Sequence, residues 1–173
     1  MPEPAKSTPA ATDVIKREIQ NWTVGGLLDA ASDRHGDRPF LVGSTVTTFH
    51  QAAERSRRIA AWLRSHGVKR GDRVAICAAN GPEVALIVFA AARLGAVFVV
   101  INSQIKAHGF RQIFNQCEPV VAVLDETTAE LSAETGMAVT VSLGGQCVGE
   151  SVPFAALLAA EDPGGNSLPG HRS

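Results

Sequence analysis

The chain has 173 residues, of which 45% are hydrophobic and 19% are charged, so it can bury a core and is not wholly disordered. Its formal net charge is −1 with scattered basic residues, which favours neither a nucleic-acid partner nor an anionic membrane. The three cysteines are widely spaced and form no C-x-x-C pair, which indicates reduced thiols in a cytoplasmic protein rather than a disulfide framework.

The N-terminal part of the sequence predicts a leader, a helix and an extended segment. Residues 1–20 are rich in Pro, Ala, Ser and Thr without an apolar stretch, so we predict a disordered leader and no secretory signal. Val24–His35 is predicted as a helix that Thr23 caps and Gly36 ends. Phe40-Leu41-Val42 then begins an extended segment after a turn.

The clearest helical pattern begins at Thr48. This residue and Gln51 have the spacing of a capping box, in which each side chain bonds to the other residue's backbone N–H. Apolar residues then recur at helical spacing as far as His66-Gly67. The opposite face is predicted to be solvated and carries Arg55, Arg57, Arg58 and Arg64.

The middle of the chain predicts a strand, a buried helix and a second strand. The strand Arg73–Cys77 follows a tight connection, and Asn80 is the expected cap of a helix that ends at Leu94. This helix is apolar nearly all round, so we expect it to be buried on both sides. Val97–Ile101 is continuously apolar, which predicts a central strand of a parallel sheet covered on both faces.

A membrane span is not predicted for the apolar stretch Val84–Ile101. The stretch contains Arg93, and an arginine near the centre of a bilayer costs about 2.5 kcal/mol or more. The sequence Arg93-Leu94-Gly95 indicates instead that a buried helix ends and a buried strand follows. We therefore predict no transmembrane segment.

The second half continues the alternation of helices and strands. The predicted elements are a helix at Ala107–Gln116, a strand at Val120–Leu124, a helix at Glu126–Glu134 and a strand at Ala138–Val141. Such alternation predicts an α/β fold, a parallel sheet with helices on both faces. Residues 161–173 are rich in Pro, Gly, Asn and Ser and are predicted to form a loop.

Motifs for catalysis and metal binding were sought in the residues themselves. The sequence contains no G-x-x-x-x-G-K-[ST] phosphate loop, no G-x-G-x-x-G after a first strand and no H-E-x-x-H. No histidine lies at metal-ligand spacing from other ligands, and Cys77 lies in an apolar strand as a small core residue. We therefore assign no catalytic and no metal-binding residue, and the residues alone indicate an α/β domain.

Four short motifs, in order and at matching separations, resemble the AMP-forming acyl-CoA synthetases, members of the adenylate-forming enzyme family. They are Thr47-Thr48-Phe49, the connection Leu63–Val74, the helix start Ala79–Glu83, and Gly95-Ala96-Val97 followed by Ile101-Asn102-Ser103. The chain departs from the family where Val100–Ser103 replaces Pro-Leu-Asn-Pro. The stretch Ile101–Lys106 is similar to a branch that includes carnitine-type and medium- or long-chain acyl-CoA ligases.

The resemblance implies that residues 21–160 are a partial AMP-binding domain, the first α/β subdomain of the synthetase N-terminal domain. The complete enzyme would use ATP, Mg²⁺ and coenzyme A to convert a small carboxylic acid to an acyl-adenylate and then to acyl-CoA. The family's phosphate loop, T-S-G-T-T-G-x-P-K-G, does not occur in the sequence. We therefore expect the chain to be a fragment that ends before this loop, that is inactive alone and that binds none of these cofactors tightly.

Two cations are candidates for coenzyme A binding. In related synthetases a basic residue near the start of the corresponding helix holds the nucleotide end of coenzyme A, which points to Lys106 and Arg111. The alternative is that both are cations on a solvated helix surface.

Two other functions remain open. One is a free-standing α/β binding or scaffold domain derived from the synthetases. The other is a Rossmann-type nucleotide-binding protein, which the missing glycine fingerprint disfavours. A fragment of a layered enzyme would also leave an apolar face uncovered, so we expect self-association.

Overall fold

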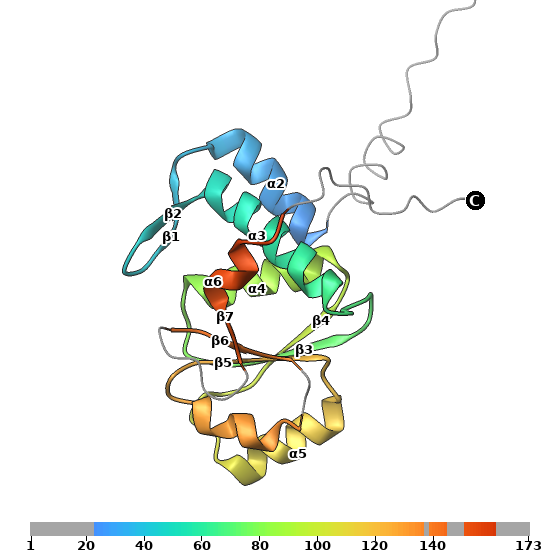
Figure 1. Cartoon of the computed structure of the whole chain (residues 1–173). Coiled ribbons are helices and arrows are strands. Elements are labelled where there is room, and N and C mark those ends of the chain that lie inside the picture. Colours follow the sequence, from blue (N-terminus) through green and yellow to red (C-terminus); the bar gives the residue numbers. More distant parts are fainter. Residues whose placement is uncertain (1–22, 137–138, 145–150, 162–173) are drawn as a thin grey trace, which may run out of the picture.

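The computed structural model describes residues 23–136, 139–144 and 151–161. At its centre is a five-stranded sheet of order β4-β3-β5-β6-β7, in which every pair of neighbouring strands is parallel. Its strands are β3 (Arg73–Cys77), β4 (Val97–Val100), β5 (Val121–Leu124), β6 (Thr140–Ser142) and β7 (Val152–Pro153). Helices cover both faces of this sheet (Figure 1), which confirms the predicted α/β fold.

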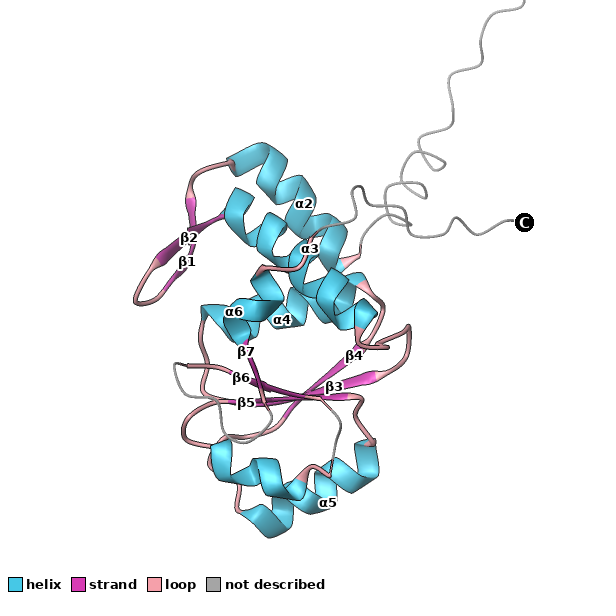
Figure 2. Ribbon diagram, viewed as in Figure 1, coloured by secondary structure: helices cyan, strands magenta, loops and turns pink. Residues whose placement is uncertain are grey.

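The helices form two layers. They are α2 (Val24–His35), α3 (Phe49–Ser65), α4 (Pro82–Arg93), α5 (Ala107–Cys117), the 3-10 helix η1 (Ala129–Glu134) and α6 (Phe154–Leu158). The helices α2, α3, α4 and α6 lie above the sheet in Figure 2, whereas α5 and η1 lie below it. A hairpin of β1 (Pro39–Val42) and β2 (Val46–Thr48) projects beside the upper layer.

The N-terminal helices begin where the sequence predicts. The Thr23 hydroxyl accepts a hydrogen bond from the Gly26 amide at 3.0 Å, so α2 has its expected cap. At the start of α3, the Gln51 amide donates to the Thr48 hydroxyl at 3.2 Å, and the Thr48 amide donates to the Gln51 side chain at 3.1 Å. These reciprocal bonds confirm the capping box.

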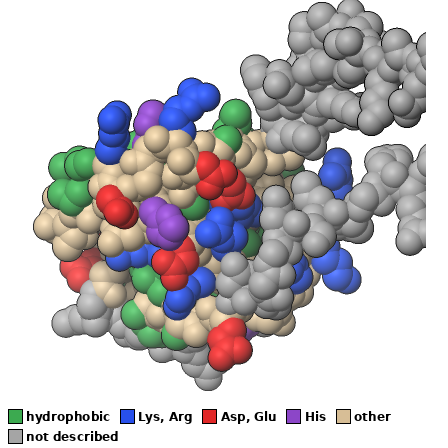
Figure 3. All heavy atoms as spheres, turned by 90° about the horizontal axis from the view of Figure 1, so that it is seen from above, with side chains coloured by type: hydrophobic (Ala, Val, Ile, Leu, Met, Phe, Trp, Pro, Cys, Tyr) green, Lys and Arg blue, Asp and Glu red, His purple; other side chains and the backbone are tan. Residues whose placement is uncertain are grey.

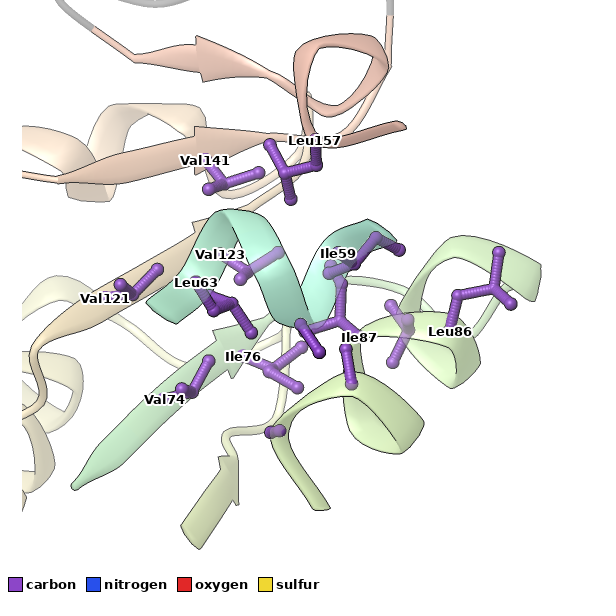
Figure 4. Packing of buried hydrophobic residues seen from close by; sticks show 14 of the residues in the cluster. Ile59, Leu63, Val74, Ile76, Leu86, Ile87, Val121, Val123, Val141 and Leu157 are labelled. Carbon is purple, nitrogen blue, oxygen red and sulfur yellow. The ribbon is translucent and has the colours of Figure 1, made fainter. Parts of the chain in front are cut away.

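The core has one cluster above the sheet and one below it. In β3, Ile76 belongs to the upper cluster with Ile59 of α3 and Ile87 of α4 (Figure 4). The adjacent Cys77 belongs to the lower cluster with Phe110 of α5. This alternation follows from the period of two residues along a strand. Every residue of α4 is buried or partly buried, as its all-round apolar sequence predicts.

A charged network joins α2, α3 and α4. The Asp29 carboxylate accepts hydrogen bonds from both terminal nitrogens of Arg93, at 2.7 Å each, and from Arg57 at 2.8 Å. The Arg93 Nε also donates to the Ser56 hydroxyl at 3.0 Å. Burial raises the pKa of Asp29, but the hydrogen bonds and charges of Arg93 and Arg57 outweigh it and hold this pKa below its usual value. The network therefore fixes the upper helices to one another.

The arginines of α3 are more engaged than their predicted solvated face implies. Arg55 donates to the Thr47 hydroxyl at 3.1 Å, and Arg58 donates to Glu54 at 2.7 Å, besides the bond from Arg57 to α2. All three are only partly exposed because neighbouring elements pack beside this helix. Figure 3 shows the upper layer from above, where acidic and basic side chains are interspersed.

The strand β4 lies at the edge of the sheet, so the prediction that Val97–Ile101 is a central strand covered on both faces is wrong. Within the described residues β4 pairs only with β3. Val97, Phe98 and Val100 are 50%, 41% and 59% exposed. The sequence shows that the strand is apolar, whereas the topology decides whether a neighbour lies beside it.

Three local predictions also need correction. The N-cap of α4 is Gly81 rather than Asn80, since the extended backbone continues to Gly81 and Pro82 begins the helix. The predicted helix Glu126–Glu134 is the shorter η1, because the preceding residues form a side-chain-bonded turn. The strand predicted at Ala138–Val141 is β6, and residues 137–138 lie outside the described residues.

The short elements β7 and α6 were not predicted. The predicted leader, residues 1–20, and nearly all of the predicted loop, residues 161–173, lie outside the described residues. In the part of the chain that the structure describes, no helix has both the length and the apolar character that a membrane span requires.

Candidate functional site

The carboxyl edge of the sheet is the natural place for a ligand in this topology. The chain passes from β3 over α4 to β4, then back under the sheet through α5 to β5 on the other side of β3. The connections that leave β3 and β5 therefore go to opposite faces. In open α/β sheets, ligands bind in the crevice outside the strand ends at such a switch point. The loops here are Ala78–Gly81 and Asp125–Thr128.

Asp125 bonds to both of these loops. Its carboxylate accepts the Ala79 amide at 2.6 Å, the Thr127 amide at 2.9 Å and hydroxyl at 2.7 Å, and the Thr128 amide at 3.1 Å. Burial raises the pKa of Asp125, but these hydrogen bonds outweigh it and lower the pKa below its usual value. The side chain is therefore a charged acceptor that joins the end of β3 to the end of β5.

Thr128 completes this connection. Its buried hydroxyl donates to the Cys77 carbonyl at 2.6 Å and accepts the Asp125 amide at 3.0 Å. The switch point between β3 and β5 is thus bridged by the chain's own side chains. Sequence reasoning missed this arrangement because Glu126 was included in a helix, although an Asp followed by two threonines after a strand is a turn signal.

The end of β4 forms a second turn at the same edge. The Asn102 side chain accepts the Gln104 amide at 2.9 Å, and the Asn102 carbonyl accepts the Ile105 amide at 3.0 Å. The helix α5 then begins after Lys106, which has extended backbone and caps no amide with its side chain. This turn fixes where the first turn of α5 meets solvent.

The two predicted coenzyme A ligands, Lys106 and Arg111, are exposed residues of α5. Arg111 Nε lies 2.6 Å from the Glu134 carboxylate of η1. The hydrogen bond from Arg111 lowers the pKa of Glu134. Since five residues turn an α-helix through about 500°, the two cations start from directions roughly 140° apart. The structure therefore brings Arg111 to Glu134 and leaves the role in coenzyme A binding as a prediction.

Cys77 and the histidines have structural surroundings. Burial, and secondly the charge of Asp125, raise the pKa of the Cys77 thiol to about 11, which suits a core residue and not a nucleophile. His66 stacks on Trp62 with ring centroids 3.8 Å apart and contacts the Trp62 carbonyl at 2.9 Å. Within the described ranges, no three His, Cys, Asp or Glu side chains are grouped so that they could hold a metal ion.

Comparison with known proteins gives the fold a context. Residues 28–165 match the family described as AMP-binding enzyme. A Bacillus subtilis protein that bears the name acyl-CoA synthetase YngI is 31% identical over 110 residues, which is 62% of this chain and 20% of that protein. Probable acyl-activating enzyme 10 of Arabidopsis thaliana is 30% identical over 138 residues, 78% of this chain and 23% of that protein.

A solved structure is similar over most of the described fold. It is a Rhodopseudomonas palustris protein described as a long-chain-fatty-acid CoA ligase, with a TM-score of 0.76 and 25% identity. The similarity covers 84% of this chain and 38% of that one. The chain thus spans about a fifth to a quarter of the length of the curated relatives reported above.

Proposed function

The chain belongs to the AMP-binding enzyme family, and on that premise we propose that it is part of an ATP-dependent acid–CoA ligase. In the proposed reaction a carboxylate attacks the α-phosphate of Mg-ATP, giving an acyl-adenylate and pyrophosphate. The thiol of coenzyme A then attacks the acyl carbon and AMP leaves. The complete enzyme would act in the cytoplasm on a small carboxylic acid, with ATP, Mg²⁺ and coenzyme A.

The extent of the family match is the observation that supports this proposal most. The matched residues, 28–165, run from α2 through α6 and include every strand of the parallel sheet. A match of this extent concerns the whole arrangement of sheet and helices rather than one short motif. The two relatives and the solved structure bear the names of acyl-activating enzymes or acid–CoA ligases, which favours the same class of reaction here.

We assign the chain a scaffold role within that enzyme. Backbone N–H groups of a glycine-rich loop are needed to hold the leaving pyrophosphate, and the family's T-S-G-T-T-G-x-P-K-G loop does not occur in the 173 residues. At the carboxyl edge, Asp125 and Thr128 bond to the chain's own backbone. We therefore expect the chain alone to bind ATP and coenzyme A weakly and to catalyse no adenylation.

The role proposed for Lys106 and Arg111 is electrostatic. Both are exposed, so their positive charges can attract the phosphates of coenzyme A from solvent. Arg111 already pairs with Glu134, and a phosphate would have to displace this carboxylate. Removing the carboxylate should consequently strengthen binding of coenzyme A if Arg111 holds its phosphates.

A chimera tests the proposed function. Residues 1–173 would be joined to the part of YngI that follows its matched segment, and ATP–pyrophosphate exchange would be measured with a panel of carboxylic acids. We expect exchange from the chimera and none from the chain alone. The control is the chimera in which the lysine of its phosphate loop is replaced by alanine. A folded chimera without exchange would favour a free-standing binding or scaffold domain, and exchange by the chain alone would contradict the scaffold role.

A further inference from the structure

The exposed edge of the sheet at β4 lacks the features that normally protect such edges. The residues Ala96–Asn102 include no charged residue and no proline. Phe98 and Val100 are 41% and 59% exposed. Natural proteins usually protect an edge strand with a charge, a proline or a bulge, because unpaired N–H and C=O groups otherwise bind another strand. This edge is therefore suited to pairing.

The hydrogen bonds to β3 show which backbone groups face outward. The Val97 amide donates to the Asp72 carbonyl at 2.7 Å, and the Ile101 amide donates to the Ile76 carbonyl at 2.8 Å. Backbone groups of successive strand residues point to alternate sides. The N–H and C=O groups of Phe98 and Val100 consequently point away from β3, and no described strand pairs with them.

These outward groups are self-complementary. When two antiparallel copies of β4 meet about a two-fold axis at Val99, Phe98 of each copy lies opposite Val100 of the other. Both residues then donate and accept a hydrogen bond, which is the hydrogen-bonded pair of an antiparallel ladder. The side chains of Phe98 and Val100 lie on one face, so each aromatic ring would meet a β-branched partner. The neighbouring pair of Val97 with Ile101 is also uncharged.

We propose that the chain forms a two-fold dimer through β4, which joins the two sheets into one. The proposal is independent of the ligase function, because it concerns only the edge of the sheet and a second copy of the same chain. An isologous interface requires one patch that is complementary to itself, and the spacing of Phe98 and Val100 about Val99 satisfies that requirement. A short edge buries little area, so the dimer should be weak and dependent on concentration.

Sedimentation equilibrium of the full chain over a range of concentrations tests the dimer. Val100→Lys should weaken dimerisation about tenfold or more, because the charge would have to be desolvated in the interface. The matched control is Val42→Lys on the hairpin, where the valine is 74% exposed and off the edge. This control should leave the dimer unchanged. A monomer at all concentrations, or dissociation by the Val42 variant and not by the Val100 variant, overturns the proposal.

Disulfide trapping tests the register. Val99 faces Val99 of the second copy in a pair whose Cα atoms are about 4.5 Å apart, whereas the two Val97 residues are about 13 Å apart along the strands. Oxidised Val99→Cys should therefore form a covalent dimer, and Val97→Cys should not exceed the background that the native cysteines give in the wild-type chain. Equal cross-linking by both variants would exclude this register. A chain that stays monomeric alone and pairs only when the remainder of a ligase is added would assign the edge to a different strand.

Discussion

Replacing Arg93 by methionine removes the cation at the centre of the network between α2, α3 and α4 while keeping a side chain of similar length. Arg93 is 10% exposed and its partner Asp29 is 24% exposed. The variant loses both hydrogen bonds to the carboxylate and the bond to the Ser56 hydroxyl. Asp29 would retain Arg57, whose bond to it measures 2.8 Å.

The expected loss in the free energy of unfolding is about 2–3 kcal/mol. Removing one partner of a fully buried ion pair costs about 3–5 kcal/mol, because a charge remains buried without its partner. Here Asp29 is only partly buried and keeps one cation, so the loss should fall below that range. The control is Arg111→Met, which breaks a pair in which the arginine is half exposed and which should cost less than about 1 kcal/mol.

The pH dependence of stability gives a second measure of the same network. The pKa of Asp29 is lowered in the folded chain from the usual value of 3.8, so the unfolded chain binds the proton at a higher pH. The stabilisation is then fully present above a pH of about 4–5 and is lost as the pH falls through the folded pKa. Asp29→Asn should remove this loss, so its stability should vary less with pH below about pH 4.

Urea unfolding followed by circular dichroism checks both expectations. The midpoint and slope would be measured for the wild type, Arg93→Met, Asp29→Asn and the double variant. Contacting groups should give a coupling free energy of about 1 kcal/mol or more in this cycle. A loss for Arg93→Met no larger than that for Arg111→Met, or additive single effects, would refute the assignment of the network as the main polar link between these helices.

Three further outcomes are expected. Thr128→Val should lower the free energy of unfolding by about 1–3 kcal/mol, since it leaves a buried carbonyl without its donor, and urea unfolding measures this. Gly25→Ala should destabilise the chain although alanine favours helices, because the new Cβ would lie 2.7 Å from the Arg93 Cγ; a raised melting temperature would contradict this. In the active chimera, Arg111→Ala should raise the KM for coenzyme A and Glu134→Gln should lower it, both with unchanged pyrophosphate exchange, and an unchanged KM rejects the proposed role.

Local hydrogen bonding and hydrophobic period were visible in the sequence. The capping pair Thr48 and Gln51, the cap at Thr23 and the strand Arg73–Cys77 all occur as predicted. Each depends on groups within a few residues of one another or on which side chains are apolar. The alternation of strands and helices also sufficed to predict a parallel sheet covered on both faces.

The candidate site was less accessible from the sequence. Lys106 and Arg111 were selected by resemblance, and the pairing of Arg111 with Glu134 joins two elements that the sequence does not place beside each other. Asp125 likewise bonds to Ala79, which lies 46 residues earlier in the chain. Such contacts depend on which loops the sheet order brings to one edge.

The sequence by itself determined the elements, their caps and the class of fold, because these follow from local geometry and from the pattern of apolar residues. Only the tertiary structure decided which strand stands at the edge and which charges meet. Val97–Val100 is as apolar as an interior strand, yet it lies beside β3 alone in the described sheet. Arg93 and Asp29 meet across 64 residues of sequence because α2 and α4 pack in the same layer, and side-chain periodicity carries no record of that neighbour.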